Sequence, residues 1–466
     1  MLIDTEKRTF PVTSPYDGQT LEELEYNSPD EVESFLSQGC DLARKKPLEK
    51  WRRIEALEYA SARLKRDIDC FAMLIAQEAG KPLRDARVEA LRASEGLKHA
   101  ANTLAMSHGR EVPFDHVSSD RSASGSTVLE PIGLVVAISA FNHPLNLVVH
   151  QVAPAIAAGC PVIIKPSLDT PLSCRKLVDL LVESGISEEY CRVALVENDL
   201  SEKLVTDKRV AFLSFIGSAR VGWSLRSKLA PGTRCSLEHG GVAPAIVLDD
   251  ADFSLAAERL AIGAYYHAGQ VCVSTQRIFV SKRNLDFFVE FFEKASLGLI
   301  VGDPRSDETQ IGPLIRQKEA DRVATWIEDA LESGGKLLFR GKRLGPNLLG
   351  PSAVLNPSKN CRLAMEEVFG PVVVIFTYDT VEEAVAEANA LPWAFQASVF
   401  SKSLTEVENV GRQLDASTVL VNEHTAFRVD SMPFSGWRES GLGQGGIEAT
   451  FHEMCREKLT INVTNK

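Results

Sequence analysis

The chain has 466 residues, of which 44% are apolar and 24% charged, and its formal net charge at pH 7 is −12. This length exceeds one ordinary hydrophobic core, so we expect two or three domains. The acidic excess argues against nucleic acid as a general partner, because binding phosphates requires a basic face. Nine cysteines without a CxxC pair or a metal-ligand spacing favour free thiols in a reducing, cytoplasmic compartment, with no metal site.

One segment is apolar enough to suggest a membrane span. Residues 131–164 contain no Asp, Glu, Lys or Arg, but Asn142, His143, Pro154 and other polar or helix-breaking residues interrupt them. We therefore expect buried strands and a buried helix there, and no membrane partner. The first ten residues are charged from Asp4 onward and lack the apolar core of a signal peptide.

Helices are predicted first along the chain. Apolar residues recur at three- and four-residue spacing over 30–77 and again over 83–107, with a break at 78–82. Residues 113–126 are polar and are predicted to cross the surface.

Strands and helices then alternate in two series. In the first series, strands are predicted at 132–139, 161–166 and 211–218, each followed by a helix. This alternation is typical of a doubly wound parallel sheet. The second series begins near Gly240 and comprises a strand at 243–248, a helix at 254–267, a strand at 277–280, a helix at 284–295 and later strands at 371–378 and 417–422.

The tail of the chain, residues 458–463, alternates in polarity like an edge strand that seeks a partner. No low-complexity linker separates the two series, so we predict two closely packed α/β domains.

Cys272 lies in the stretch GAYYHAGQVCVSTQR, residues 263–277. A nucleophilic cysteine needs access, a lowered pKa and a nearby base. The small neighbours of Cys272 give it access, but His267 is the only candidate base in the local sequence. The alternative interpretation is a buried structural cysteine.

Two glycine-rich motifs are candidates for a phosphate-binding turn. Residues 441–446 match GxGxxG, but no apolar strand precedes them, and we interpret them as a turn near the end of the second domain. Residues 217–222 directly follow a predicted strand and open a helix, so their N–H groups could face a pyrophosphate. Lys165 and Ser167, at the carboxyl end of another strand, favour the same sheet edge.

Glu238 and Asn142 are candidate catalytic residues with ordinary alternatives. Glu238 precedes two glycines at the junction of the two series, where it is either a base or an exposed acid. Asn142 is either a turn former or an amide donor aimed at developing negative charge.

Taken together, these motifs resemble the aldehyde dehydrogenase superfamily over essentially the whole chain. The resemblance implies two doubly wound α/β domains, one Rossmann-like for the cofactor and one catalytic, plus a small β oligomerisation element. The cofactor domain would comprise 1–112 and 131–239, the catalytic domain 240–442, and the oligomerisation element 113–130 and 443–466. The matching blocks, in family order, are EAGKP at Glu78, PIGLVVAISAFNHPLN, PVIIKPS, SFIGSARVG, LEHGG, HAGQVC, EEVFGPV at Glu366 and PFSGWRESGLG.

Position by position, the resemblance implies Cys272 as the nucleophile, Glu238 as the base that activates water, and Asn142 as half of an oxyanion hole. It also implies NAD or NADP as the cofactor, a small aldehyde as the substrate, and a homodimer or homotetramer. The cofactor-binding residues implied are Phe141, Lys165, Ser167, Gly217, Ser218, Gly222, Glu367 and Phe369, with Lys165 at the adenosine ribose and Glu367 at the nicotinamide ribose.

The chain departs from the family pattern at positions near the cofactor. Leu168 stands where many NAD-dependent members have an acid, so NADP becomes acceptable without excluding NAD. His239 replaces the leucine of ELGG, Arg438 replaces the lysine of PFGGxK, and Ile216 replaces a threonine. These departures leave the catalytic trio intact.

The blocks FNHPLN, HAGQVC and FRVD resemble most the branch that oxidises lactaldehyde, phosphonoacetaldehyde and semialdehydes. Arg92, on one helix stripe with Val88 and Gly96, is expected to face the substrate tunnel; the alternative is a surface ion pair with Glu89 or Glu95. His424 and Arg428 are expected on the loop that lines the tunnel, or else on a solvated loop.

Two other classes of function remain open. A coenzyme A-acylating enzyme or a cysteine hydrolase would resolve the thioester differently, and a catalytically idle relative would only bind ligands. The intact trio argues against an idle protein, and Glu238 favours water over coenzyme A as the acceptor.

Overall fold

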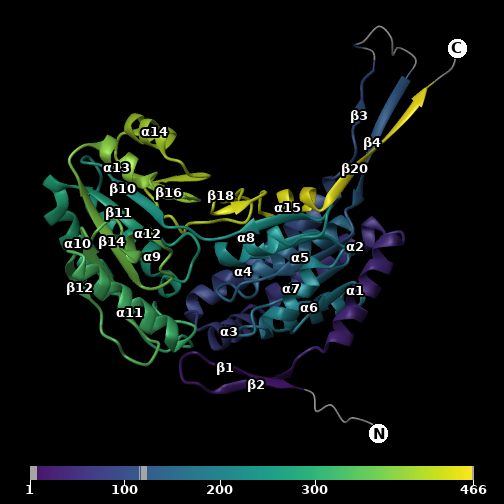
Figure 1. The fold of residues 1–466 in the computed structure, drawn as a ribbon, viewed down its shortest axis with the longest axis horizontal. Helices are drawn as coiled ribbons and strands as arrows, with labels where there is room; N and C mark the ends of the chain where they lie inside the picture. The colour runs from purple at the N-terminus through teal and green to yellow at the C-terminus, as the bar shows by residue number, and fades with distance from the viewer. Residues whose placement is uncertain (1–7, 115, 117–122, 464–466) are drawn as a thin grey trace.

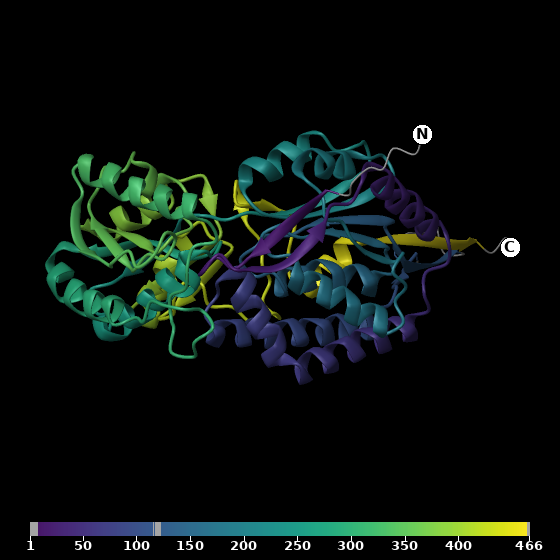
Figure 2. The same cartoon turned by 90° about the horizontal axis from the view of Figure 1, so that it is seen from below.

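The computed structural model describes residues 8–114, 116 and 123–463. These residues form two lobes side by side, and a thin arm of strands extends from one of them (Figures 1 and 2). The expectation of a charged N-terminus concerns mainly residues 1–7, which lie outside the described residues, as do 115 and 117–122 of the predicted surface crossing. Within the described residues, no helix combines the length and apolar character needed to cross a membrane.

The predicted helical segment 30–77 is divided into three helices. A capping box at Ser28, whose side chain accepts from the Glu31 N–H, begins the first helix. Pro47 lies in the first gap, where it cannot supply a helical N–H, and Asp67 separates the second and third helices. The three helices are α1 (Pro29–Arg44), α2 (Lys50–Arg66) and α3 (Ile68–Ala79), and the predicted helix 83–107 is α4 (Leu83–Met106).

The first lobe is built on a six-stranded sheet of order β19-β9-β8-β5-β6-β7, in which only β19 runs antiparallel to its neighbour. This confirms the predicted doubly wound sheet. Its strands are β5 (Leu134–Ile138), β6 (Val162–Lys165), β7 (Cys191–Val193), β8 (Val210–Ile216), β9 (Arg234–Glu238) and β19 (Gly441–Leu442), and the helices between them are α5 (Asn146–Ala158), α6 (Leu172–Glu183), α7 (Asn198–Thr206) and α8 (Ala219–Ser227).

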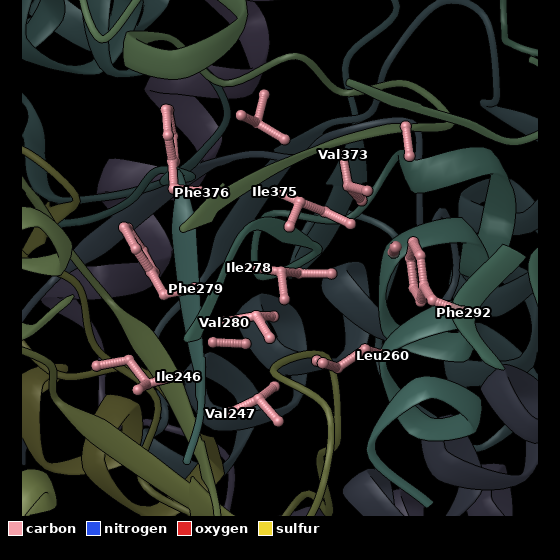
Figure 3. Close-up of a cluster of buried hydrophobic side chains, with 14 of the residues drawn as sticks. Ile246, Val247, Leu260, Ile278, Phe279, Val280, Phe292, Val373, Ile375 and Phe376 are labelled. Atoms are coloured by element: carbon pink, nitrogen blue, oxygen red, sulfur yellow. The ribbon is translucent and has the colours of Figure 1, made fainter. Parts of the chain in front are cut away.

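The second lobe contains a seven-stranded sheet of order β12-β13-β14-β11-β10-β16-β17, parallel except for β12. Its central strands bury side chains on both faces (Figure 3), and Phe279 stacks on Phe376 with ring centroids 5.7 Å apart. The strands are β10 (Ala243–Val247), β11 (Thr275–Ser281), β12 (Lys336–Arg340), β13 (Ser352–Leu355), β14 (Val372–Tyr378), β16 (Gln396–Phe400) and β17 (Thr418–Val421), and the helices are α9 (Phe253–Tyr265), α10 (Leu285–Leu297), α11 (Gln317–Glu332), α12 (Arg362–Met365), α13 (Val381–Ala388) and α14 (Leu404–Gln413).

The arm in Figure 1 is a three-stranded sheet of order β20-β4-β3. Its strands are β3 (Glu111–Val112), β4 (Ala123–Pro131) and β20 (Cys455–Val463), and β20 lies at the edge, as the alternating tail predicts. After Cys455 every residue of β20 is exposed. Two small antiparallel pairs complete the strands: the hairpin of β1 (Thr9–Thr13) with β2 (Thr20–Glu25), and the pair of β15 (Trp393–Ala394) with β18 (Trp437–Arg438).

The structure corrects the predicted assignment of residues 441–454. β19, within the glycine-rich motif, pairs with β9 of the first sheet rather than ending the second domain. The next helix, α15 (Ile447–Glu453), belongs to neither the second lobe nor the arm, because Ile447 and Phe451 are buried in the same apolar cluster as α4 and α5. Of the predicted oligomerisation segment 443–466, the described part in the arm is therefore β20.

Candidate active site

A cavity of about 740 Å³ lies between the lobes and is lined by residues of both. The carboxyl ends of β5, β6, β8 and β9 contribute one side, and the loops that carry Cys272, Glu367 and His424 contribute the other. Every site residue predicted from the sequence lines this cavity except Gly222, which lies one turn into α8.

Cys272 is presented by a strained turn. The predicted helix 254–267 ends early, at Tyr265, because His267, Ala268 and Gly269 adopt positive φ values of 49°, 55° and 72° in the following 3₁₀ turn. A side chain at Gly269 would overlap the carbonyl oxygen of Gly370, so glycine is required there. Backbone strain of this kind is typical of functional sites.

The strained turn is held by Gln270. Its Oε1 accepts from the Ile315 N–H at 2.9 Å, and its Nε2 donates to the Pro313 carbonyl at 3.3 Å. Its own carbonyl accepts from Asn142 Nδ2 at 2.9 Å, which uses one of the two N–H bonds of that amide. The oxyanion candidate is therefore tied to the backbone two residues before Cys272. The sequence block HAGQVC contains Gln270, but nothing in that block indicates that the Gln270 side chain holds the turn.

His267 does not serve as a local base for Cys272. It does not line the cavity, and both of its ring nitrogens are buried without a hydrogen-bond partner among the described residues. Burial, and then the charge of Lys81, lower the pKa of His267 well below its ordinary value.

The Cys272 thiol lies in an environment that favours its protonated form. Burial raises its pKa well above the ordinary value, and the nearby Glu367 and Glu238 carboxylates raise it further, against the opposing charge of Arg428. The free protein therefore holds a thiol, and a positive charge brought into the cavity would favour the thiolate.

The two carboxylates of the cavity have unusually high pKa values. Burial raises the pKa of Glu238 to about 7, with Arg428 opposing, and that of Glu367 to about 8. Glycines make room for both, because a Cβ at Gly445 would overlap Glu238 and one at Gly240 would overlap Glu367. A carboxylate with a pKa near neutrality suits general-base chemistry at pH 7.

Helix α5 begins on a buried charge pair. Glu89 accepts from the N–H groups of Leu145 and Asn146 at 3.0 and 3.1 Å, and pairs with the ammonium of Lys81, which is also fully buried. A carboxylate at a helix N-terminus is favourable, and this one fixes the loop that carries Asn142.

Arg92 lines the cavity, as expected, but a carboxylate already neutralises it. Its Nε and Nη2 both donate to Asp430 at 2.9 Å, so its ion-pair partner is Asp430 and not the alternative, Glu89 or Glu95. Asp430 also bonds with His150 at 2.7 Å and accepts from Asn146 at 3.2 Å. Burial would raise the pKa of Asp430, but the bonds from His150 and Arg92 outweigh it and hold the pKa well below its ordinary value.

Arg428 differs from Arg92 because no carboxylate among the described residues forms an ion pair with it. Its Nη1 is buried without a partner among the described residues, and its guanidinium lies 3.7 Å from the ring centroid of Phe434. Burial, and then Arg92, lower its pKa to about 10, while Glu238 and Asp430 oppose the shift. His424 also lines the cavity, with Nδ1 unpartnered among the described residues. Sequence reasoning names both arginines but misses Asp430, although FRVD contains it.

The opposite end of the cavity suits an anion and an aromatic ring. Ser218 precedes α8 without capping it by its side chain, and no acid lies in the first turn. The Ala219 and Arg220 N–H groups there have no partner within the described ranges. Such a helix end attracts phosphate. Nearby, Phe141 meets Phe369 edge-on at 5.8 Å, and Phe369 has a φ of 46°.

Leu168 packs into an apolar cluster with Phe10 and Leu24, so its position offers no carboxylate to a ribose. The next residue, Asp169, is paired with Arg316. Lys165 lines the cavity, and burial lowers its pKa, with Asp169 opposing.

Comparison with known proteins agrees with this geometry. The sequence model of the aldehyde dehydrogenase family matches residues 2–460. A 3-sulfolactaldehyde dehydrogenase of Priestia megaterium is 34% identical over 98% of this chain and 96% of its own length. Aldehyde dehydrogenase 21 of Physcomitrella patens, solved with the reaction product succinate, has a TM-score of 0.94 at 30% identity, covering 99% of this chain and 96% of that one. The glyceraldehyde-3-phosphate dehydrogenase of Methanocaldococcus jannaschii, solved with NADP, has a TM-score of 0.93 at 30% identity, covering 99% and 100%.

The high pKa of Cys272 predicts slow alkylation in the free protein. At pH 9, Glu367→Gln should speed carboxamidomethylation of Cys272 by iodoacetamide, by about tenfold if the lost charge is worth one pKa unit. Mass spectrometry of the Cys272 peptide measures the rate apart from that of the exposed Cys70. Glu290→Gln, an exposed change on α10, is the matched control, and equal rates in the two variants would contradict the electrostatic argument.

Proposed function

Because this chain belongs to the aldehyde dehydrogenase family, we propose that it oxidises a small anionic aldehyde to the carboxylic acid, with NAD or NADP as hydride acceptor. It is an oxidoreductase of the aldehyde group. The observation that carries the proposal is the convergence of Cys272, Glu238 and Asn142 in one cavity with Arg428, whose Nη1 has no partner within the described residues.

The chemistry follows from the positions of these groups. The Cys272 thiol loses its proton to solvent, the thiolate sulfur attacks the aldehyde carbon, and the carbonyl π bond breaks to leave an oxyanion in reach of the remaining Asn142 N–H. A bound nicotinamide supplies the acceptor for the hydride that the thiohemiacetal must lose. Glu238 then takes a proton from water as the water oxygen attacks the thioester, and the C–S bond breaks to return the thiol.

The cofactor residues proposed from the family resemblance fit one surface of the cavity. The turn at Gly217 and Ser218, with the open N–H groups of α8, suits a pyrophosphate, and Lys165 with Ser167 suits the adenosine ribose. Glu367, Phe141 and Phe369 would then lie toward the nicotinamide. Gly222 would support the turn from behind, in α8, without contacting the cofactor. The Methanocaldococcus jannaschii relative was solved with NADP.

We assign the two arginines different roles. Arg428 has a free donor in the cavity and would hold the anionic group of the substrate. Arg92 is neutralised by Asp430 and would hold in place the loop that carries both Asp430 and Arg428. His424 is proposed as a further substrate contact. The sulfolactaldehyde and succinate named for the two relatives above are both anionic at neutral pH.

Coenzyme A transfer and simple cysteine hydrolysis remain the alternative functions. Glu238, poised by burial in the same cavity as Cys272, favours water as the acceptor. Reduced-nicotinamide absorbance produced from aldehyde without coenzyme A separates the proposal from both alternatives.

We propose that each lobe and the arm have the separate roles that the family resemblance implies. The first lobe would bind the cofactor, the second would supply the nucleophile, and the arm would join copies of the chain. All nine cysteines are free, which supports a reducing compartment such as the cytoplasm.

Cys272→Ala should abolish aldehyde oxidation while leaving cofactor affinity unchanged, because only the covalent step is lost. Spectrophotometric assay and calorimetric titration with NAD⁺ measure the two properties. Cys70→Ala, an exposed cysteine, is the control and should keep full activity. Oxidation by the Cys272 variant would refute the mechanism.

Arg428→Ala should raise KM for succinate semialdehyde about 10- to 150-fold more than KM for butanal, since only the anionic substrate loses a charge-assisted contact worth roughly 1.5–3 kcal/mol. Arg92→Ala frees Asp430 and should impair both substrates alike. Equal losses for both substrates in the Arg428 variant would show that this arginine serves the fold instead.

With Leu168 in place of an acid, we expect kcat/KM with NADP to lie within about tenfold of that with NAD, a gap of about 1.4 kcal/mol. Steady-state assays with each cofactor measure the ratio. A roughly thousandfold preference for NAD, about 4 kcal/mol, would contradict the prediction that the chain accepts NADP.

We expect a homo-oligomer by light scattering at micromolar concentration. Leu459 and Ile461 alternate along β20 and are 45% and 48% exposed, so they present an apolar edge strand to a second copy. Replacing both with Lys should yield monomers, whereas the matched change of Thr460 and Asn462 on the opposite face should have a smaller effect. A monomeric wild type would refute the assembly.

A further inference from the structure

His239 is a buried histidine whose protonation is fixed by its neighbours. It directly follows β9, its side chain is almost wholly buried, and Nδ1 lies 2.9 Å from the Glu439 carbonyl oxygen. A carbonyl only accepts, so Nδ1 carries the proton and Nε2 is left as a bare acceptor in the neutral ring. Among the described residues Nε2 has no hydrogen-bond partner.

The imidazole lies directly behind the phosphate-binding turn proposed above. It packs so closely on Gly222, in the first turn of α8, that a Cβ there would overlap the ring. Phe215 and Trp223 meet it edge-on at 5.9 and 5.4 Å, and Trp223 Nε1 donates to the same Glu439 carbonyl at 3.2 Å. The ring is therefore held in one orientation, and it lines the cavity together with Gly217 and Ser218.

No charged side chain of the described residues is paired with this ring. The charged residues on the elements packed against it are Arg220 and Arg226 of α8, Arg234 and Glu238 of β9, and the exposed Glu439, and the Arg226 guanidinium lies 5.5 Å from the Trp223 ring centroid. Burial lowers the pKa of His239, and the bond to Glu439 only partly offsets this. In the free protein the ring is thus neutral at pH 7, because it is buried beside the positive end of a helix.

We propose that His239 takes up a proton at Nε2 when the pyrophosphate of the dinucleotide binds at the start of α8, so that cofactor affinity is linked to pH. The proposal rests on the cofactor site described above. Binding replaces the uncompensated positive helix end by a net negative charge, which favours the imidazolium. One N–H bond forms, the proton comes from solvent, and no other bond changes.

The sign of the linkage follows directly. The pKa of His239 is low in the free protein and higher in the complex, so the protonated state binds more tightly. Between these two pKa values the Kd should rise by up to about tenfold for each unit of pH, and it should be constant above and below that window.

Calorimetric titration with NAD⁺ from pH 5.5 to 8.5 tests the proposal. NAD⁺ is the right probe because it lacks the 2′-phosphate of NADP, which titrates in this range. Titrations in two buffers of different ionisation enthalpy count the protons taken up. Glu238 and Glu367 also titrate in this range, so the readout is the difference between variants. We expect the wild type and His452→Leu, an exposed control on α15, to take up as much as one proton more on binding than His239→Leu, and their Kd to rise more steeply with pH.

His239→Gln guards against misfolding of the leucine variant, because glutamine keeps a polar side chain but does not titrate in this range. A wild-type slope that persists in both His239 variants overturns the proposal, as does a uniform loss of affinity at every pH, which would indicate packing alone. If the wild type does not bind NAD⁺ at any pH, the proposed cofactor site itself fails. Binding with the same proton count in the wild type and in both His239 variants refutes only the role of His239.

Discussion

The chemistry of this protein depends on the removal of water from four ionisable groups that share one cavity. Cys272, Glu238, Glu367 and Arg428 all line this cavity and are partly buried, and burial is the largest cause of the pKa shift of each. Burial favours the neutral forms of the thiol and the two carboxyls, so that they can lie close together without strong mutual repulsion. The thiol of the nucleophile consequently stays protonated until a ligand brings positive charge into the cavity.

The two lobes contribute complementary parts to this arrangement. The parallel sheet of the first lobe brings Glu238 and the open end of α8 to one edge, as such sheets generally do. The second lobe supplies the nucleophile on a turn with a strained backbone, and hydrogen bonds of the Gln270 side chain hold this turn in place. Asp430 connects them, because it lies on a loop after β17 and receives hydrogen bonds from α4 and α5. The seam between the lobes is thus a network of specific polar contacts.

Much of this was predictable because local sequence patterns carry it. Apolar runs that alternate with helical segments predict the two sheets, and the glycine, cysteine and glutamate motifs locate the residues that line the cavity. Ion pairs and strand pairings between residues far apart in the sequence were not predictable, because periodicity carries no information about distant pairs. Arg92 illustrates this: its neighbours on α4 suggested Glu89 or Glu95, yet its partner is 338 residues away. The placement of β19 and α15 failed for the same reason, since chain order assigned them to the wrong neighbours.

The segment from β19 to β20 has a consequence for how the protein is made. Gly445, which borders the Glu238 carboxylate, follows every strand of the second sheet in the chain and lies between β19 of the first sheet and the arm. During synthesis the first lobe can collapse on its own apolar core long before these residues leave the ribosome. The wall beside the base is therefore added after the cores of the lobes. A nascent or truncated chain that lacks Gly445 carries Cys272 in an unfinished pocket.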